Sequence, residues 1–135
     1  MESKVYHFPV RVYYEDTDHS GVVYHANYLK YFERAREEVI GSEKLAAMWK
    51  EEKIGFAVYK LDIHYNEGAE FGDLLDIRTS FRKDGDYRVV WRQEAWRKNG
   101  KKAAVTANIQ LVCVSHDKKL VKIPNLDLFD QTQIH

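Results

Sequence analysis

The hydrophobic period of the sequence changes twice, and these changes restrict the fold more than any other feature. Apolar residues alternate with polar ones over residues 6–14, recur every three or four residues over 27–40, and alternate again from residue 57 onward. A period of two is typical of a half-buried strand, and a period of about 3.6 is typical of an amphipathic helix. The pattern therefore predicts one strand, one long helix and then a series of strands.

The long helix is expected to run from Asn27 to about Ile40. Its charged residues lie on one side, and its apolar stripe consists of Tyr28, Phe32, Ala35 and Val39. Gly41 and Ser42 interrupt this pattern, and Ser42 is suited to start a second, shorter helix that ends near Lys53.

The first strand is expected to end near Glu15. Further alternating runs follow the helices, over residues 57–65, 75–81, 87–97 and 105–113, and a short one covers 120–123. The dipeptides Asp84-Gly85 and Asn99-Gly100 separate neighbouring runs, and both are strong hairpin signals. We expect these strands to form an antiparallel meander.

One strand, a helical pair and a meander make a single α+β domain over residues 1–135, in which one long helix packs on one antiparallel sheet of five to six strands. A single sheet with one helix leaves edge strands and part of its surface uncovered. A second copy of the chain would cover them, so we expect at least a homodimer.

The composition excludes several partners. The chain has 21 Lys and Arg against 21 Asp and Glu, and its formal net charge of zero gives no long-range field for nucleic acid or anionic lipid. Aromatic and arginine residues alternate over 87–97, which a strand with a core face and a solvent face explains.

No stretch approaches the roughly 20 apolar residues that span a membrane. The single cysteine, Cys113, is expected in the core and fits a reducing compartment, so the cytoplasm is the expected location.

The segment from Tyr14 to Tyr28 places two acidic residues, Asp16 and Asp18, just before the expected helix. Free N–H groups in the first turn of a helix can hold a developing oxyanion, and a nearby carboxylate can attack a carbonyl or activate water. This arrangement is typical of a hydrolase. Taken alone, however, an aspartate before a helix is more often a turn or capping residue.

Other chemistries have less support. The run from Asp16 to Gly21 matches the first positions of an EF-hand calcium loop, but Asn27 stands at its twelfth position and a strand precedes it. His19 and His25 do not form an i,i+4 pair on a helix, so we expect no metal site. Motifs for a serine nucleophile, a phosphate loop and dinucleotide binding are absent from the sequence.

The segment from Arg11 to Arg36, RVYYEDTDHSGVVYHANYLKYFERAR, resembles the 4-hydroxybenzoyl-CoA thioesterase family. Within that family the chain is similar, over its whole length, to the acyl-CoA thioesterases associated with the bacterial Tol-Pal system. The resemblance implies the hotdog fold, a long antiparallel sheet wrapped around one central helix. It also implies dimers that join their sheets edge to edge and often pair into tetramers.

The resemblance also implies site residues, each of which matches a position of the family motif. The aspartate of the Asp-x-x-Gly step is Asp18, which would act as a nucleophile on the thioester carbon or as a general base on water. The backbone N–H at the helix start, at His25, would polarise the thioester carbonyl, and the His25 side chain is also implicated in activity. Tyr14, Tyr24 and Asn27 match motif positions and are expected to contact substrate or to shape the loop.

The implied reaction is hydrolysis of an acyl-CoA, with an acyl carrier protein thioester as a further candidate substrate, and it requires no cofactor. Family members commonly bind the coenzyme A phosphates through basic residues near the dimer interface, for which Arg82, Arg88 and Lys122 are candidates here. A hotdog dehydratase and a non-catalytic acyl-CoA-binding module are the alternatives. The acyl group and the choice between dimer and tetramer stay open at this point.

Overall fold

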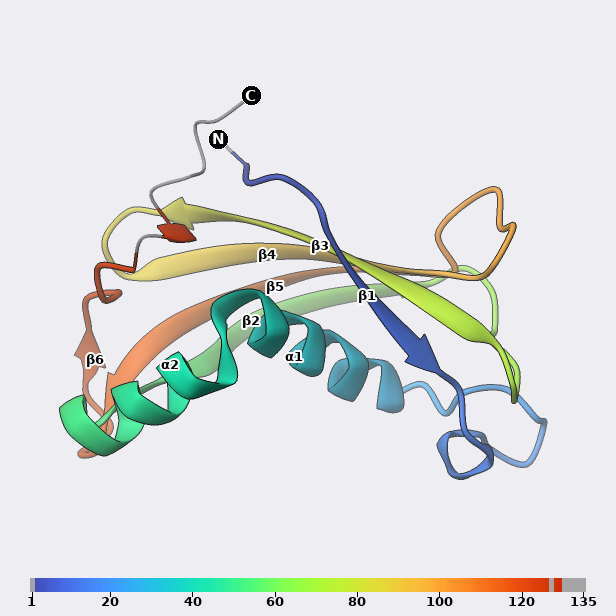
Figure 1. Ribbon diagram of the computed structural model, residues 1–135, viewed down its shortest axis with the longest axis horizontal. Coiled ribbons are helices and arrows are strands. Elements are labelled where there is room, and N and C mark those ends of the chain that lie inside the picture. The colour runs from blue at the N-terminus through green and yellow to red at the C-terminus, as the bar shows by residue number, and fades with distance from the viewer. Residues whose placement is uncertain (1, 127, 130–135) are drawn as a thin grey trace.

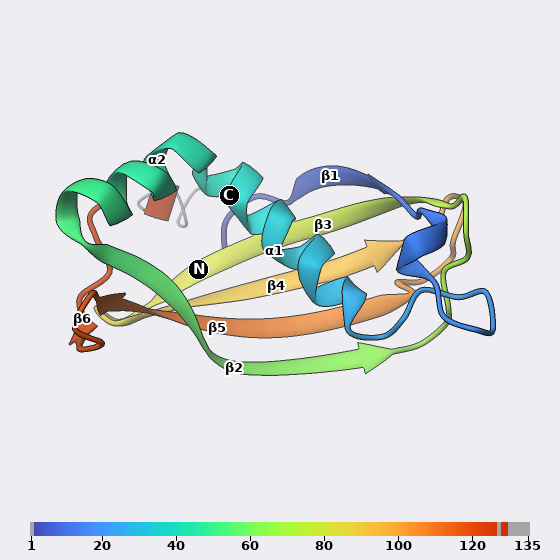
Figure 2. The same ribbon diagram turned by 90° about the horizontal axis from the view of Figure 1, so that it is seen from below.

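The computed structural model describes residues 2–126 and 128–129. The strands are β1 (Tyr6–Arg11), β2 (Ile54–Tyr65), β3 (Leu74–Asp84), β4 (Arg88–Trp96), β5 (Val105–Ser115) and β6 (Leu120–Val121). The helices are the 3-10 turn η1 (Tyr14–Asp16), α1 (Asn27–Ile40), α2 (Ser42–Ala47) and the π-helical turn η2 (Met48–Glu52). All strands belong to one antiparallel sheet, and α1 lies along one of its faces (Figure 1, Figure 2).

Helix α1 occupies the predicted residues, and its apolar stripe packs on the sheet. Tyr28, Phe32 and Ala35 retain only 2%, 0% and 1% of their exposed surface. Fully burying a large apolar side chain stabilises a fold by roughly 1.5–3 kcal/mol. Gly41 ends the helix with φ 106°, in the left-handed region that favours glycine. The stripe and this stop together fix the length and the buried face of α1.

The strand order is β1-β3-β4-β5-β2, with β6 paired to β5. The predicted meander is confirmed for β3, β4 and β5, which follow one another through the two expected hairpins. It is wrong for β2, which lies at the far edge and pairs with β5 from Ile54 opposite Ser115 to Tyr65 opposite Val105. Residues 66–73 join β2 to β3 without a tight-turn signal and are long enough to cross the end of the sheet.

Burial alternates along the strands and identifies the inner face. On β4, Val89, Trp91 and Ala95 are buried, whereas Arg92 lies on the outer face and is exposed. Cys113 on β5 is also fully buried, and this burial raises the pKa of its thiol to about 12. The thiol is therefore a core group, as its alternating strand predicted, and is not ionised at neutral pH.

Three boundaries differ from the predicted ones. Strand β1 ends at Arg11 and not near Glu15, because η1 follows and is held by the hydrogen bond from the Tyr13 N–H to Asp16 Oδ2 (2.9 Å). The second helix becomes π-helical after Ala47. Strand β2 starts at residue 54, earlier than expected. The first departure depends on a local hydrogen bond and the third on the pairing of Ile54 with Ser115, and a hydrophobic period reports neither.

β1 and β2 are the edge strands of the sheet. β1 carries Pro9, which has no N–H to offer and so weakens pairing with another strand. β2 instead exposes 52% of Val58, 63% of Tyr59 and 38% of Leu61. The uncovered apolar edge that the sequence predicted is therefore β2.

A buried polar side chain ties α1 to the sheet. Gln93 on β4 donates to the Phe32 carbonyl (2.9 Å) and to Thr79 Oγ1 (3.1 Å). Its Oε1 accepts a hydrogen bond from Arg36 Nη1 (2.9 Å), and Arg36 is only 8% exposed. Burial disfavours the charged form and lowers the pKa of Arg36 below its ordinary value. The amide of Gln93 thus supports a guanidinium that sits among apolar groups.

We expect Gln93→Leu to lower the free energy of unfolding by about 2–4 kcal/mol, because it leaves the Arg36 guanidinium and the Phe32 carbonyl without their buried partner. Urea denaturation followed by tryptophan fluorescence measures the loss. The double variant Gln93→Leu/Arg36→Met should recover part of it, since both ends of the contact are then apolar. Strictly additive losses from the two substitutions would contradict this coupling.

Candidate active site

A tight turn before α1 presents the predicted catalytic aspartate. The chain folds back between η1 and α1, where Thr17 pairs with Val23 and the Asp18 N–H donates to the Val22 carbonyl (2.8 Å). Gly21 takes φ 85° in this turn, a conformation that costs glycine little. The spacing of Asp18 and Gly21 in the sequence is therefore the spacing that this turn requires.

The carboxylate of Asp18 is accessible to solvent and ionised at neutral pH. Its Oδ1 accepts two hydrogen bonds from Ser20, one from Oγ (2.6 Å) and one from the backbone N–H (2.8 Å). These bonds stabilise the charged form and hold the pKa of Asp18 below its ordinary value. Asp18 therefore closes the turn, as turn aspartates commonly do, and also supplies a carboxylate for chemistry.

Asp16, the other acid of the segment, has a structural role. Its carboxylate accepts from the Tyr13 N–H, and its carbonyl oxygen accepts from the Tyr24 N–H and from Asn27 Nδ2, both at 2.9 Å. Asn27 is the first residue of α1, so this amide holds the loop against the helix start. Of the two roles expected for Asn27, its hydrogen bond supports the shaping of the loop.

The N-terminus of α1 is open. The residue at its N-cap position, Ala26, has no capping side chain, and the first turn of the helix contains no acidic residue. In the part of the chain that the structure describes, no backbone carbonyl accepts from the N–H groups of His25 or Ala26. Free N–H groups at a helix start can hold a developing negative charge. They are therefore candidate oxyanion donors.

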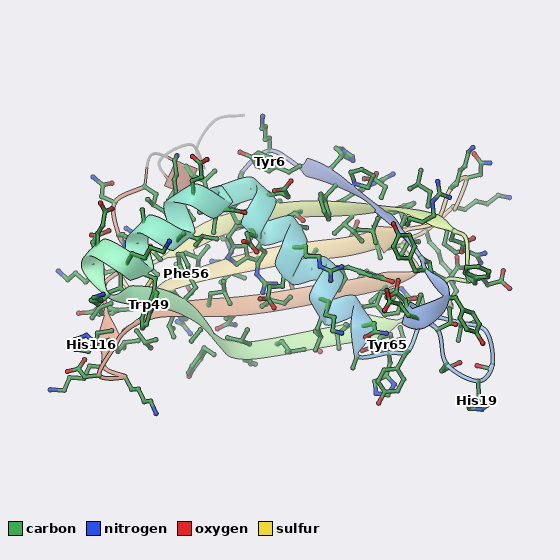
Figure 3. All side chains as sticks on the ribbon, turned by 60° about the horizontal axis from the view of Figure 1, so that its bottom comes forward. Tyr6, His19, Trp49, Phe56, Tyr65 and His116 are labelled. Atoms are coloured by element: carbon green, nitrogen blue, oxygen red, sulfur yellow. The ribbon has the colours of Figure 1, made fainter. Side chains whose placement is uncertain are left out.

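The exposed side chain of His25 lies close to two aromatic rings. The ring centroids of Tyr24 and Tyr65 lie 4.5 Å and 6.2 Å from that of His25. Tyr65 Oη also donates to the His25 carbonyl oxygen (3.0 Å). Tyr65 ends β2, at the same end of the molecule as the turn that carries His19 (Figure 3). The sequence identified Tyr65 only as a strand residue, and the pairing of β2 with β5 brings it here.

Exposed aromatic rings flank the turn. Tyr14 is 78% exposed, and its ring packs edge-on against Phe71 with 5.8 Å between centroids. Tyr24 is 46% exposed. The sequence analysis did not single out Phe71, although one aromatic residue in the polar segment NEGAEFGD is a signal that could have found it. Tyr14 and Tyr24 therefore lie on a surface that a substrate can reach.

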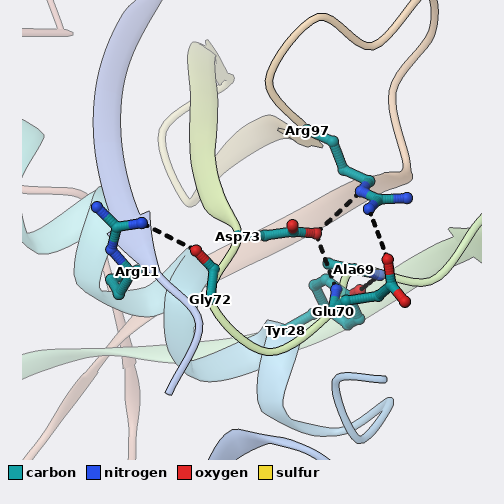
Figure 4. Close-up of polar contacts among 7 residues, drawn as sticks. All are labelled: Arg11, Tyr28, Ala69, Glu70, Gly72, Asp73 and Arg97. Atoms are coloured by element: carbon teal, nitrogen blue, oxygen red, sulfur yellow. Dashed lines mark hydrogen bonds and ion pairs between the residues drawn. The ribbon is translucent and has the colours of Figure 1, made fainter. Parts of the chain in front are cut away.

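The connection between β2 and β3 is hydrogen-bonded to the turn and to α1, and Figure 4 shows its polar contacts with Tyr28, Arg11 and Arg97. The Val23 N–H donates to the Ala69 carbonyl (2.9 Å), and the Ala69 N–H donates to Tyr28 Oη (3.2 Å). The side chain of Arg97 holds the connection by two ion pairs, to Asp73 at 2.9 Å and to Glu70 at 3.1 Å. The turn, the first residues of α1 and this connection therefore form one network.

The candidate phosphate-binding residues lie elsewhere. Strand β3 begins beside the turn and runs to the opposite end of the molecule (Figure 2), and Arg82 is about 25 Å along it at about 3.3 Å per residue. There Arg82 and Arg88 share one carboxylate, Asp84, at 3.9 Å and 3.4 Å. Lys122 follows β6 near the same end. Within one chain these three residues therefore lie far from Asp18, and their expected role as phosphate contacts stays a prediction.

Two cavities flank α1. The β2-side cavity, of about 300 Å³, lies between the second half of α1 and β2, and its apolar walls are Ile40, Leu45, Met48, Phe56, Val58 and Leu111. The β1-side cavity, of about 340 Å³, lies between the first half of α1 and β1. Figure 2 shows α1 between these two edge strands. A substrate held at the helix start would therefore have one cavity on each side of α1.

A sheet wrapped around one helix, with an ionised carboxylate beside an open helix start, defines a hotdog-fold thioesterase. The chain belongs to the thioesterase superfamily, whose family model matches residues 20–104. Acyl-CoA thioester hydrolase YbgC of Escherichia coli O6:H1 is 37% identical over 94 residues, 69% of this chain and 70% of that protein. Acyl-CoA thioesterase YbgC of Haemophilus influenzae is 37% identical over 113 residues, 82% of each chain.

Solved structures share the architecture. A probable thioesterase from Bartonella henselae matches with a TM-score of 0.81 and 32% identity, covering 90% of this chain and 100% of that one. A mutant 4-hydroxybenzoyl CoA thioesterase complexed with 4-hydroxybenzoyl CoA has the same fold, with a TM-score of 0.83 at 18% identity over 96% and 99% of the two chains. The predicted hotdog fold, the predicted family and the thioester hydrolase class are confirmed.

Among residues 2–126 and 128–129, none of the helices has the length and apolar character needed to cross a membrane. The same part of the chain contains no group of three or more His, Cys, Asp or Glu side chains placed to hold a metal ion.

Replacing Ser20 by alanine is expected to raise the pKa of Asp18 toward its ordinary value, because the hydroxyl hydrogen bond that favours the charged form is lost. A ¹³C NMR titration of the Asp18 carboxyl measures the change in the ligand-free protein. Ser42→Ala removes a similar exposed hydroxyl, one bonded to Glu37, and should leave Asp18 unaffected. Identical titrations of Asp18 in both variants would contradict the assigned role of Ser20.

Proposed function

We propose that this protein hydrolyses acyl-CoA thioesters to a free acid and coenzyme A at the start of α1. The observation that carries the proposal is the ionised carboxylate of Asp18 in the turn that leads into an uncapped helix N-terminus. The relatives named as acyl-CoA thioesterases support coenzyme A as the carrier of the acyl group. An acyl carrier protein thioester is a second candidate substrate.

The N–H groups of His25 and Ala26 are the proposed donors to the thioester carbonyl oxygen. They are available because no described backbone carbonyl accepts from them. Donors fixed in this position stabilise the negative charge that develops on the oxygen when the carbonyl carbon is attacked. The His25 side chain, which lies close to Tyr24 and Tyr65, is a second candidate contact to the same group.

Asp18 is the proposed attacking group. A carboxylate oxygen of Asp18 adds to the thioester carbon, the carbon–sulfur bond breaks, and coenzyme A leaves as a thiolate that takes up a proton. Water then hydrolyses the mixed anhydride, which releases the acid and restores Asp18. As a general base, Asp18 would instead take a proton from an attacking water. Its lowered pKa keeps Asp18 ionised at neutral pH, which both routes require.

Neither route needs a metal or a cofactor, because a carboxylate, water and aligned N–H groups supply the attack and the charge stabilisation. The buried free thiol of Cys113 suits a reducing compartment, and the cytoplasm is the proposed location.

The β2-side cavity is the proposed site of the acyl group. Glu33, the first residue of α1 that lines it, is about 10 Å from the helix start at about 1.5 Å per residue. Beyond Glu33 the walls are mainly apolar, apart from Arg36 and Glu37. An acyl chain that leaves the thioester along this side of α1 would bury its apolar surface there.

A homodimer, or a tetramer of such dimers, is the proposed assembly. The exposed apolar residues of β2, Val58, Tyr59 and Leu61, lie on an edge that a second copy of β2 would extend. Because Tyr65 ends the same strand and touches His25, this pairing would place a partner subunit close to the site.

Asp18→Asn is expected to lower kcat for acyl-CoA hydrolysis by about 10²–10⁴-fold, since the amide is neither a nucleophile nor a base. The fold should persist, because an asparagine oxygen can still accept from Ser20. Thiol release from a panel of acyl-CoAs and circular dichroism measure the two effects. Asp86→Asn, an exposed acid of the β3–β4 hairpin, is the matched control.

Unchanged turnover in Asp18→Asn would refute the mechanism. If the natural protein released no thiol from any acyl-CoA yet still bound one, a hotdog dehydratase or a binding module would replace the proposed hydrolase.

Gly55→Leu is expected to shift acyl preference toward short chains. A Cβ at Gly55 meets only the Trp49 ring, at ordinary van der Waals distance (3.9 Å), and Gly55 lines the β2-side cavity, so a leucine there is expected to occupy part of that cavity. KM should rise for long-chain acyl-CoAs and stay constant for acetyl-CoA. An equal change for both substrates would show that the acyl group does not enter this cavity.

A further inference from the structure

Tyr65, the last residue of β2, reaches the start of α1 with its hydroxyl group. Figure 3 shows Tyr65 at the end of the molecule where α1 begins. Its Oη donates to the carbonyl oxygen of His25 (3.0 Å), which lies 40 residues earlier in the chain. Partial burial raises the pKa of Tyr65 above its ordinary value, so the hydroxyl keeps its proton at neutral pH. Tyr65 therefore acts as a donor to the backbone that enters the helix.

The carbonyl that Tyr65 contacts and the N–H of Ala26 belong to the same peptide unit. A trans peptide is planar, and its C=O and N–H point in opposite directions. The described residues contain no cis peptide bond. Fixing the His25 carbonyl oxygen therefore also fixes the direction of the Ala26 N–H, which points away from Tyr65.

The preceding peptide unit is held in the same way. The Tyr24 carbonyl accepts from the Asn27 N–H (2.8 Å), and the N–H of this unit is that of His25. No described backbone carbonyl accepts from the N–H of His25 or of Ala26. Both proposed oxyanion donors are therefore free at the N–H end of their peptide and anchored at the carbonyl end, one by the backbone and the other by Tyr65.

A hydrogen bond to a carbonyl also strengthens the N–H of the same peptide as a donor. Electron density drawn toward the carbonyl oxygen leaves the N–H more positive, and hydrogen bonds in a chain polarise one another. Negative charge develops on the thioester oxygen as the carbonyl carbon is attacked, and the Ala26 N–H then gains most from the Tyr65 hydroxyl. The stabilisation is larger in the transition state than in the bound substrate, and such a difference raises kcat.

The position of Tyr65 is itself fixed by the sheet. Its backbone pairs with that of Val105 on β5, and the N–H of the next residue, Asn66, donates to the Ala104 carbonyl (2.8 Å). The Tyr65 ring lies 5.9 Å, between centroids, from that of Tyr28, which is only 2% exposed. A donor that is fixed before the reaction needs no rearrangement as the charge develops. The pairing of β2 with β5 therefore supplies a preorganised hydroxyl at the start of α1.

We propose that Tyr65 is a positioning residue for thioester hydrolysis, whose hydroxyl orients and polarises the His25–Ala26 peptide so that the Ala26 N–H stabilises the charge on the thioester oxygen. The inference rests on the proposed function and adds to it a residue of β2 that acts without touching the substrate. Because its effect passes through the backbone, Tyr65 should govern the rate of the reaction and leave substrate binding unchanged.

The first test is Tyr65→Phe, which keeps the ring and removes the hydroxyl. We expect kcat for acyl-CoA hydrolysis to fall about 5- to 10-fold, the equivalent of one neutral hydrogen bond, and KM to stay unchanged. This loss is smaller than the roughly 10²–10³-fold loss that follows removal of a direct oxyanion donor. The control is Tyr87→Phe in the β3–β4 hairpin, a tyrosine that is 43% exposed against 46% for Tyr65, and it should alter neither constant.

Two kinetic results would overturn the inference. An unchanged kcat would show that the Tyr65 hydroxyl has no part in the reaction. A higher KM with the same kcat would show that Tyr65 contacts the substrate directly and contributes uniform binding. Failure of the proposed function is a separate result, because the natural protein would then release no thiol from any acyl-CoA.

The second test uses NMR of the ligand-free protein and needs no activity. A hydrogen bond at a carbonyl shifts the amide ¹⁵N resonance of the same peptide unit, so Tyr65→Phe should move the Ala26 resonance and Tyr87→Phe should not. The His25 amide, which belongs to the preceding peptide unit, should move less. An unmoved Ala26 resonance would overturn the polarising role. Equal shifts across residues 24–28 would show a general loosening of the helix start and would overturn it as well.

Discussion

Burial of α1 on the inner face of the sheet is the interaction on which the rest of the structure depends. The stripe of Tyr28, Phe32 and Ala35 must leave water, and the alternating residues of β3, β4 and β5 provide the apolar surface that receives it. Because α1 then lies along the strands, its N-terminus reaches the end of the sheet where the β2–β3 connection crosses. The catalytic turn and the helix start are brought together by this packing, and the Asp16–Asn27 hydrogen bond closes the junction.

The site combines the carboxylate of Asp18, which hydrogen bonds keep ionised, with two backbone N–H groups that make no backbone hydrogen bond within the described residues. The helix start has no capping side chain, so the N–H groups of His25 and Ala26 are not consumed by local structure. The two hydrogen bonds from Ser20 hold Asp18 in position and keep it charged. A thioester needs little more than an attacking oxygen and fixed donors to its carbonyl oxygen, which explains how one loop and one helix end can suffice.

The buried polar groups of α1 connect the helix to its neighbours. Arg36 is buried and is supported by Gln93, which is itself hydrogen-bonded to α1 and β3, so this group serves the packing of the helix. Tyr31 is equally buried, and its hydroxyl faces the side chain of Asp16 in η1. The helix is therefore linked to the sheet at Arg36 and to the segment before the catalytic turn at Tyr31.

The sequence by itself determined the local elements: α1 from Asn27 to Ile40, the two hairpins, and the acidic segment with Asp16 and Asp18 before the helix, because each depends on residues close together in the chain. The family resemblance then selected Asp18 and named His25. Only the tertiary structure decided that β2 lies at the far edge, since its partner β5 is separated from it by two other strands in the chain. That long-range pairing brings Tyr65 to His25 and places Arg82 and Arg88 at the opposite end from Asp18. The hydrophobic period indicates which face of an element is buried but not which element covers that face, so the cavities on either side of α1 could be identified only in the folded chain.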